Sequence, residues 1–123
     1  MKLDGVHHVS INVHDVEVCE RFMTEVLGLE KIPRPDFGFP GVWLRSGGQE
    51  IHLIQVPNHV APKGQHFAFR VGDLDGTIGE LRSRGVEVSR AMDIPGVGRQ
   101  AFFHDPAGNM IELNEPKAGR AAL

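Results

Sequence analysis

The sequence contains a single cysteine, Cys19, among its 123 residues. One cysteine cannot form a disulfide within the chain, so we expect a reducing compartment and a cytoplasmic location. Cys19 shares a predicted helical face with Val16, Phe22 and Val26, a pattern typical of a buried structural thiol rather than a nucleophile. Residues 1–5 lead into a strand pattern without the apolar stretch of a signal peptide.

Long apolar runs and clusters of like charge are also missing. No run approaches the roughly 20 apolar residues that a membrane-spanning helix needs, so we expect no membrane partner. The 13 Lys and Arg and the 16 Asp and Glu residues are spread along the chain and give a net charge of −3. Without a basic cluster, nucleic acid is not an expected partner either. With 41% hydrophobic residues, the chain has the composition of an ordinary globular domain.

Two segments of the sequence occur twice. Residues 8–16, HVSINVHDV, match residues 66–74, HFAFRVGDL, at an offset of 58 (66 − 8). Residues 48–53, GQEIHL, match residues 108–113, GNMIEL, at an offset of 60 (112 − 52). Two nearly equal offsets indicate two copies of one unit of about sixty residues, which is too few copies for a solenoid.

Each copy predicts a strand, a helix and then three strands. Period-two alternation marks the strands, an Asp begins each helix and a Gly ends it. These residues are Asp15 and Gly28 in the first copy, and Asp73 and Gly85 in the second. The predicted strands cover residues 6–13, 29–32, 42–45, 50–56, 66–71, 86–90, 100–104 and 110–114. We place the modules at residues 5–57 and 65–115 of a single domain, 1–123, that ends in a tail at 116–123.

Four ionisable residues fall on one face of the predicted strands. Side chains alternate between the two faces, so the apolar set can pack on the helices and the polar set faces the open side. At equivalent positions of the two copies, that open side carries His8, His52, His66 and Glu112. Any one of these histidines alone fits a structural role. Together they indicate a divalent metal, because imidazole and carboxylate are normal ligands of Zn, Fe, Ni and Mn.

These residues resemble the glyoxalase, bleomycin resistance and extradiol dioxygenase (vicinal oxygen chelate) superfamily. The similarity is carried by His8-x-x-x-x-Val13-x-Asp15 and by residues 102–113, FFHDPAGNMIEL. It implies an α+β fold of two tandem βαβββ modules, whose curved mixed sheets form a cup with the helices outside. It also implies a homodimer that completes the cup. In metal-binding members the ligands come from the first and last strands of each repeat, here His8, His52, His66 and Glu112.

Three departures from the resemblance bear on the reaction. Glyoxalase I has Glu or Gln at the position of His52, and a basic residue for glutathione near the neutral Asn12. Glutathione hemithioacetal is therefore not the expected substrate. Extradiol dioxygenases use two His and one carboxylate, which this chain contains, but they also carry an active-site tyrosine. This chain has no tyrosine, and Phe102 stands near the expected position. Drug-sequestering members generally lack the ligands altogether.

The prediction is a metal-dependent lyase, isomerase or epimerase that acts on a small substrate with vicinal oxygens through a metal-stabilised enolate. The metal is expected to be Fe, Ni, Zn, Co or Mn. Three imidazoles and one carboxylate leave a divalent ion with a net positive charge, which favours a substrate that becomes anionic. Glu112 is the candidate base, with His52 as the alternative proton carrier. Arg70 either holds an anionic substrate group or forms a surface salt bridge, and Asn12 is a candidate substrate contact.

Two alternatives remain open at this point, a non-haem Fe(II) extradiol-type dioxygenase and a small-molecule-binding or resistance protein. Two loops, residues 31–41 and 92–99, are expected to shape the pocket, but they match no signature that identifies a substrate. Phe37, Phe39 and Trp43, in a stretch rich in Pro and Gly, either pack in the fold or cover an apolar ligand.

Overall fold

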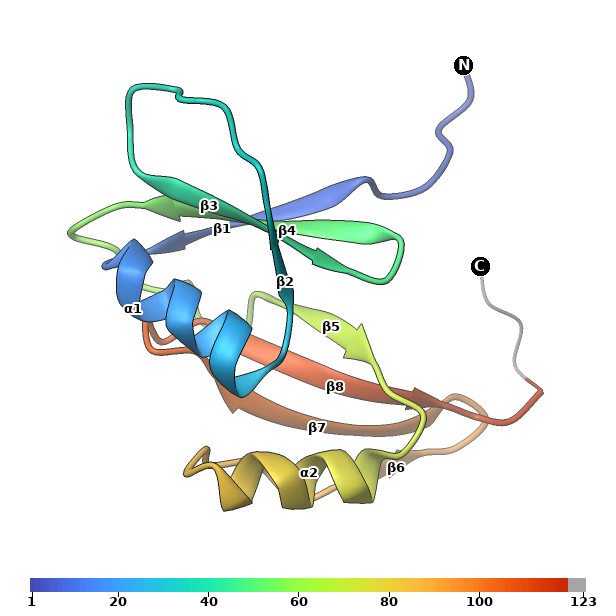
Figure 1. The fold of residues 1–123 in the computed structure, drawn as a ribbon. Helices are drawn as coiled ribbons and strands as arrows, with labels where there is room; N and C mark the ends of the chain where they lie inside the picture. Colours follow the sequence, from blue (N-terminus) through green and yellow to red (C-terminus); the bar gives the residue numbers. More distant parts are fainter. Residues whose placement is uncertain (120–123) are drawn as a thin grey trace. The chain divides into compact units, whose positions relative to one another are not determined.

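The computed structural model describes residues 1–119, so the last four residues of the predicted tail lie outside the described residues. The chain divides into two compact units. Unit 1 comprises Met1–Ala61 and Pro106–Asn109, and unit 2 comprises Pro62–Asp105 and the residues from Met110 onward. Each unit has a four-stranded mixed sheet of its own, with a helix along one face of that sheet (Figure 1).

Unit 1 is built in the order strand, helix, three strands. Its sheet has the order β1-β4-β3-β2, with β1 parallel to β4 and the other pairs antiparallel. Its elements are β1 (His8–Val13), α1 (Val16–Arg21), the π-helical turn η1 (Phe22–Val26), β2 (Glu30–Ile32), β3 (Gly41–Ser46) and β4 (Gln49–Gln55).

Unit 2 repeats this order. Its sheet runs β5-β8-β7-β6, and β5 is parallel to β8. Its elements are β5 (His66–Arg70), α2 (Leu74–Ser83), β6 (Met92–Ile94), β7 (Gly98–His104) and β8 (Met110–Pro116).

The two sheets also share their strand register. Ser10 on β1 lies opposite His52 on β4, and Ala68 on β5 lies opposite Glu112 on β8. The internal repeat of the sequence is therefore a repeat of strand pairing. The predicted α+β fold of two βαβββ modules is confirmed.

The helices begin as the sequence predicts. Asp15 Oδ1 accepts hydrogen bonds from the backbone N–H groups of Glu17 and Val18, at 3.1 and 3.3 Å. Asp73 Oδ1 accepts one from Gly76 at 3.0 Å. These carboxylates satisfy N–H groups that have no partner within the helix.

Both helices also end at the predicted glycines. Gly28 and Gly85 have φ of +75° and +83°, a left-handed conformation that glycine adopts without steric cost. After α2, Val86 N–H donates to the Leu81 carbonyl and Gly85 N–H to that of Arg82, both at 3.0 Å. The glycine thus lets the chain turn back and satisfy two terminal carbonyls.

One strand prediction is wrong and one feature is new. Residues 86–90 form no strand, and the fourth strand of the sheet is β6 at Met92–Ile94. Ser89 N–H donates to the Phe102 carbonyl at 2.9 Å, but Phe102 N–H donates to the Ser89 hydroxyl at 2.8 Å. A side chain therefore replaces the backbone acceptor that a strand would provide. The first helix ends in a π-helical turn, in which Leu27 N–H donates to the Phe22 carbonyl at 3.1 Å.

Apolar side chains of the strands and helices form the core of each unit. Each fully buried Leu or Phe contributes about 1.5–3 kcal/mol relative to an exposed one. Cys19 is fully buried, as expected of a structural thiol. The most deeply buried residues are Val13, Cys19, Met23, Leu44 and Leu53 in unit 1, and Leu74, Ala101, Phe103, Ile111 and Leu113 in unit 2. Within residues 1–119, no helix has the length and hydropathy to cross a bilayer.

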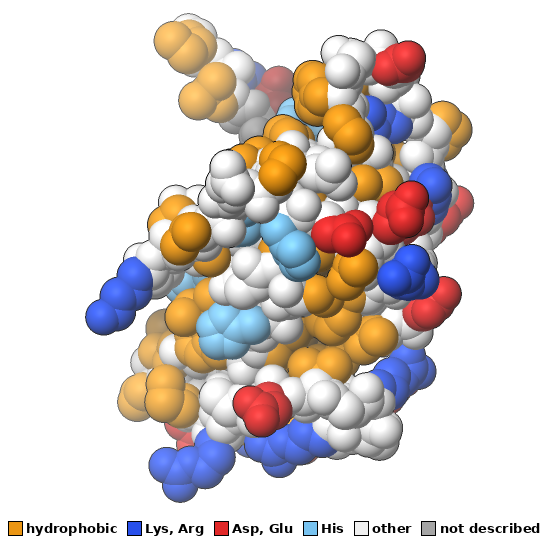
Figure 2. Space-filling model, turned by 90° about the vertical axis from the view of Figure 1, so that its left-hand side faces the viewer, with side chains coloured by type: hydrophobic (Ala, Val, Ile, Leu, Met, Phe, Trp, Pro, Cys, Tyr) orange, Lys and Arg blue, Asp and Glu red, His pale blue; other side chains and the backbone are white. Residues whose placement is uncertain are grey.

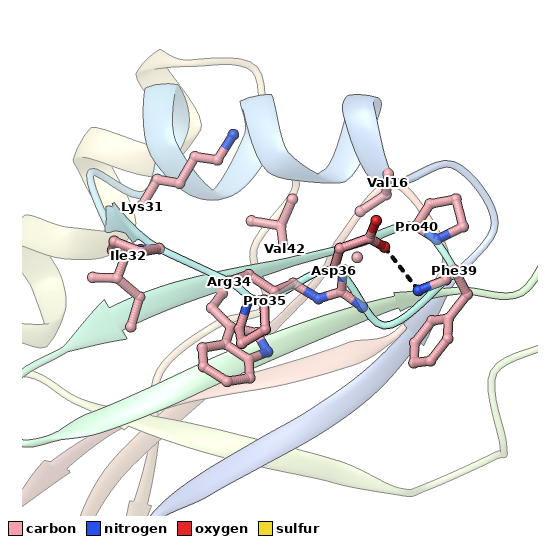
Figure 3. A pocket seen from close by; sticks show the side chains of 13 residues that line it. Val16, Lys31, Ile32, Arg34, Pro35, Asp36, Phe39, Pro40 and Val42 are labelled. Carbon is pink, nitrogen blue, oxygen red and sulfur yellow. Dashed lines mark hydrogen bonds between the residues drawn. The ribbon is translucent and has the colours of Figure 1, made fainter.

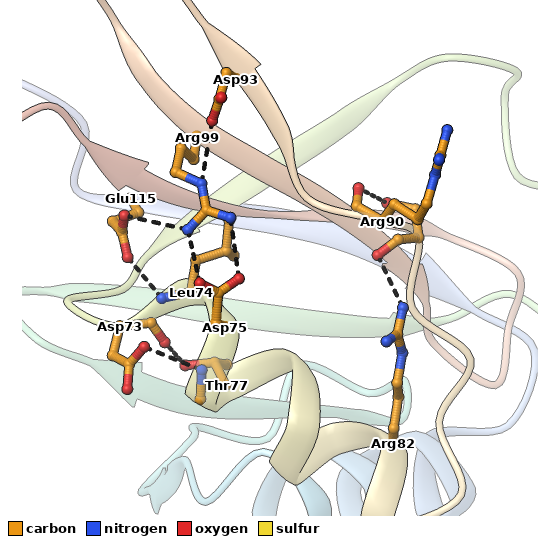
Figure 4. Close-up of polar contacts among 11 residues, drawn as sticks. Asp73, Leu74, Asp75, Thr77, Arg82, Arg90, Asp93, Arg99 and Glu115 are labelled. Atoms are coloured by element: carbon orange, nitrogen blue, oxygen red, sulfur yellow. Dashed lines mark hydrogen bonds and ion pairs between the residues drawn. The ribbon is translucent and has the colours of Figure 1, made fainter.

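Arg99 connects three elements of unit 2. Its two Nη atoms each lie 3.0 Å from an oxygen of Asp75, on α2 (Figure 4). Its Nε donates to Asp93 on β6 at 3.2 Å, and Glu115 on β8 lies 3.8 Å from Nη1. The hydrogen bond from Arg99 holds the pKa of Asp75 below its ordinary value. This network attaches the β6–β7 hairpin to the start of α2.

Candidate functional site

Unit 2 brings two of the predicted site residues together. His66 lies on β5 and Glu112 on the adjacent β8, and His66 Nε2 is 3.1 Å from Glu112 Oε1. Ala68 lies opposite Glu112 in the register, and its short side chain leaves the carboxylate free to reach the imidazole. The His66 side chain is 33% exposed and that of Glu112 is 11% exposed, so the pair can be reached from solvent at its histidine.

The hydrogen bonds of this pair leave a place for a cation. His66 Nδ1 lies 2.9 Å from the Gly64 carbonyl oxygen, while Nε2 faces the carboxylate. A neutral imidazole has only one N–H and cannot donate to both oxygens. The pair therefore needs a second proton or a metal ion between Nε2 and Oε1.

The spacing of the two donor atoms fits a metal ion. Two ligand atoms about 2.1 Å from one ion are about 3.0 Å apart at octahedral angles and about 3.4 Å apart at tetrahedral angles. The observed separation of 3.1 Å lies within this range and is also that of an ordinary hydrogen bond. Metal-binding histidines also commonly donate their other N–H to a carbonyl, as His66 does to Gly64. Asn114 Nδ2 donates to Glu112 Oε2 at 2.9 Å and so fixes the carboxylate.

In unit 1, the imidazole of His52 lies between two other rings. It stacks on His8 with ring centroids 4.1 Å apart, and on Trp43 with centroids 4.3 Å apart. Trp43 on β3 lies opposite His52 on β4, and His8 comes from the neighbouring β1. His52 is 8% exposed, so these two rings hold the orientation of a nearly buried imidazole.

Glu50 is a site residue that the sequence reasoning missed. His52 Nε2 lies 2.9 Å from Glu50 Oε1, and this hydrogen bond is the main cause that lowers the pKa of Glu50. Glu50 and His52 are two residues apart on one strand, so their side chains share a face. This spacing of two residues on a predicted strand could have identified Glu50 from the sequence. His8 also has a partner, because its Nδ1 lies 2.9 Å from Nδ1 of His7.

The two predicted substrate contacts lie in different settings. Arg70 is exposed on β5 and forms no ion pair with any residue from 1 to 119, so the salt bridge considered for it is absent from this part of the chain. The Asn12 side chain is exposed on β1. Its backbone carbonyl accepts a hydrogen bond from Asn109 Nδ2 at 2.8 Å, and His59 Nε2 lies 2.8 Å from Asn109 Oδ1. These contacts hold the turn at residues 106–109 within unit 1.

The four predicted metal ligands thus form two pairs, His8 with His52 in unit 1 and His66 with Glu112 in unit 2. Among residues 1–119, no three His, Cys, Asp or Glu side chains are arranged so that they could hold a metal ion. Binding by all four residues stays a prediction. Figure 2 shows histidine side chains, in pale blue, exposed on the surface of the molecule.

Two units of the same βαβββ order, each with a histidine on its first strand and an ionisable residue on its last, define a glyoxalase-type protein. The chain belongs to the Glyoxalase/Bleomycin resistance protein/Dioxygenase superfamily, whose family model matches residues 5–113. The resemblance found in the sequence is thereby confirmed.

Three relatives illustrate the range of this family. Glyoxylase I 4 of Arabidopsis thaliana is 32% identical over 124 residues, which cover 92% of this chain and 71% of the relative. A glyoxalase family protein of Bacillus anthracis has a solved structure that matches with a TM-score of 0.86 and 31% identity, covering 95% of this chain and 98% of the other. TnmS3, an antibiotic binding protein from Streptomyces sp. CB03234, matches with a TM-score of 0.82 and 28% identity, covering 95% and 99%.

Proposed function

We propose that this protein is a divalent-metal-dependent enzyme of the glyoxalase type, which acts as a lyase, isomerase or epimerase on a small substrate with two neighbouring oxygens. The observation that carries the proposal is the His66–Glu112 pair. His66 Nε2 and Glu112 Oε1 are 3.1 Å apart, and a metal ion between them would meet the need of this pair for a second proton or a cation. The relationship to glyoxylase I 4 of Arabidopsis thaliana supports an enzyme rather than a purely structural protein.

The proposed ligand set is completed by the two histidines of unit 1, His8 and His52. They would join His66 and Glu112 around one ion, either within one chain or across a homodimer. His52 would supply a ring nitrogen to the ion, and its Nε2 hydrogen-bonds Glu50. When bound, the ion supplies Lewis-acid stabilisation to the two substrate oxygens.

Proton transfer is assigned to Glu112. It is the only carboxylate of the proposed set, and Asn114 holds its Oε2 while Oε1 faces the site. Released from the ion, this carboxylate would accept a proton from a carbon next to a carbonyl. His52, backed by Glu50, is the alternative proton carrier. Arg70, exposed and without an acidic partner within residues 1–119, holds an anionic substrate group, and Asn12 contacts the substrate from unit 1.

Metal content tests this proposal. Plasma mass spectrometry on protein purified anaerobically should give about one metal ion per chain. The double variant His66→Ala, Glu112→Ala should lose that metal. The double variant His14→Ala, Glu17→Ala removes the same residue types from exposed positions outside the site and should keep it. Wild type without metal, even after incubation with Fe, Ni, Zn, Co or Mn, would refute the proposal.

A binding or resistance function is the second candidate, because TnmS3 is an antibiotic binding protein at 28% identity. Tight binding of a small molecule without turnover would identify this function. Oxygen consumption with catechols would instead identify the dioxygenase alternative. The absence of tyrosine from the chain counts against this alternative, because the extradiol enzymes carry an active-site tyrosine.

A further inference from the structure

The loop between β2 and β3, residues 33–40, borders an open groove in unit 1 (Figure 3). The cavity volume is ≈ 740 Å³, within the range of about 300–1,000 Å³ that is usual for small-molecule sites. Val16, Ile32 and Val42 line it and are buried. Arg34 and Phe39, both from the loop, line it as well. The groove thus combines apolar walls with a cation.

Arg34 is the cation of this groove that has no acidic partner. Its guanidinium lies over two phenyl rings, with Cζ 4.9 Å from the centroid of Phe37 and 5.1 Å from that of Phe39. Arg34 is half-buried and forms no ion pair with residues 1–119. By contrast, Lys31 is paired with Glu20, and the exposed Asp36 accepts a hydrogen bond from Gly38 N–H at 2.8 Å. Arg34 and Asp36 are thus the two charged residues of the groove that form no ion pair within residues 1–119, and Arg34 is the one that can bind a carboxylate.

A glycine makes room for this guanidinium. A Cβ atom at Gly41 would lie 2.6 Å from the Leu53 carbonyl oxygen and 2.7 Å from Arg34 Nη2. Both separations are too short for non-bonded atoms, so a side chain at position 41 would clash with the backbone of β4 and would also shift the guanidinium. The guanidinium of Arg34 thus lies over two phenyl rings and close to Gly41.

Aromatic rings connect Arg34 with the candidate site of unit 1. Phe39, Phe37 and Trp43 form an aromatic row, with neighbouring centroids 5.9 and 6.0 Å apart. Trp43 continues the row to His52 at 4.3 Å. Phe37 is 51% exposed and Phe39 46%, so a flat ligand can contact the parts of these rings that the guanidinium does not cover.

We propose that the aromatic row and Arg34 bind an aromatic carboxylate, with its ring stacked on the row and its carboxylate on the guanidinium. Flat rings favour stacking against other flat rings, and a guanidinium matches a carboxylate through two parallel hydrogen bonds. The proposal deepens the proposed function by naming the substrate class, and it rests on that function for the ligand to be a substrate. The row ends at His52, so the bound molecule extends from Arg34 toward the proposed metal ligands of unit 1.

The fluorescence of Trp43 reports on this binding directly, because the chain has one Trp and no Tyr. The metal-free protein, kept in EDTA, is titrated with benzoate, 2-naphthoate, benzamide and cyclohexanecarboxylate, with calorimetry as a second measure. The two aromatic acids should change the emission saturably. They should bind at least about tenfold more tightly than the neutral amide and the non-aromatic acid, which corresponds to about 1.4 kcal/mol.

Two matched variants test whether the preference for a carboxylate comes from Arg34 itself or from positive charge elsewhere in the unit. Arg34→Gln should abolish the preference for benzoate over benzamide. Arg45→Gln, which removes an exposed arginine of the same unit that pairs with Glu30 at 3.6 Å, should keep it. Equal binding of acid and amide, an unchanged preference in folded Arg34→Gln, or no saturable change in folded wild type would overturn the proposal. Because EDTA removes metal, failure of the metal proposal cannot alter these results, and metal content is measured separately.

Discussion

The imidazole of His52 lies parallel to the indole of Trp43, with 9° between the two planes. On its other side His52 stacks on His8, at an angle of 17°. A histidine held between two rings keeps its plane, and its nitrogen atoms can then point only in fixed directions. The sheet thereby sets the geometry of the site in unit 1 before any ligand arrives.

Substitution of Trp43 should show how much this stacking contributes. Trp43→Leu is expected to lower the free energy of unfolding by about 1–3 kcal/mol, because it removes both apolar area and the stacked ring. Trp43→Phe keeps a ring opposite His52 and should cost less. Urea unfolding followed by circular dichroism measures both. Equal losses in the two variants would mean that stacking adds nothing beyond burial.

Gly79, inside α2, and Gly85, just after its end, should respond in opposite directions to the same substitution. Gly79→Ala lies inside α2, with no atom within 4 Å of the added methyl, and should raise stability by about 0.5–1 kcal/mol. Gly85→Ala, at φ +83°, should lower stability by about 1–2 kcal/mol because an L-residue is strained there. Thermal unfolding of both variants checks the prediction. A stabilised Gly85→Ala would show that the helix does not end in the left-handed turn described above.

The Arg99–Asp75 contact should make stability fall in acid. Arg99 holds the pKa of Asp75 below its ordinary value of 3.8, so the unfolded chain takes up a proton at higher pH than the folded one. The contribution is therefore complete above pH 3.8 and is lost as the pH falls through the lower folded pKa. Comparing urea unfolding at neutral and acidic pH for wild type and Arg99→Gln measures it. The same acid sensitivity in both proteins would contradict this account.

Asn114 should act on metal affinity without binding the metal. Its hydrogen bond to Glu112 Oε2 orients the carboxylate, and loss of such a partner typically weakens metal binding about 10–100-fold. Asn114→Ala is compared with Asn58→Ala, an exposed asparagine in unit 1, by competition with a chelating dye. Equal affinities in the two variants would remove Asn114 from the proposed site.

Much of the fold was predictable, because the repeated segments and the alternation of side chains along each strand can be read directly from the sequence. The pairing of His66 with Glu112 followed from their parity on strands that turn out to be neighbours. The prediction of a strand at residues 86–90 was wrong. The alternation of apolar and polar residues does not reveal that the Ser89 hydroxyl replaces a backbone acceptor. Glu50 was missed because only positions that are ionisable in both copies stood out, and the position equivalent to Glu50 is Met110.

X-ray absorption spectroscopy of the metal-loaded protein shows whether His8, His52, His66 and Glu112 bind one ion. We expect scattering from three imidazoles and one carboxylate at about 2.0–2.2 Å, with one imidazole lost in each of His8→Ala and His66→Ala. A spectrum with a single imidazole, unchanged in His8→Ala, would show that the unit 1 histidines bind no metal and would contradict the proposed ligand set.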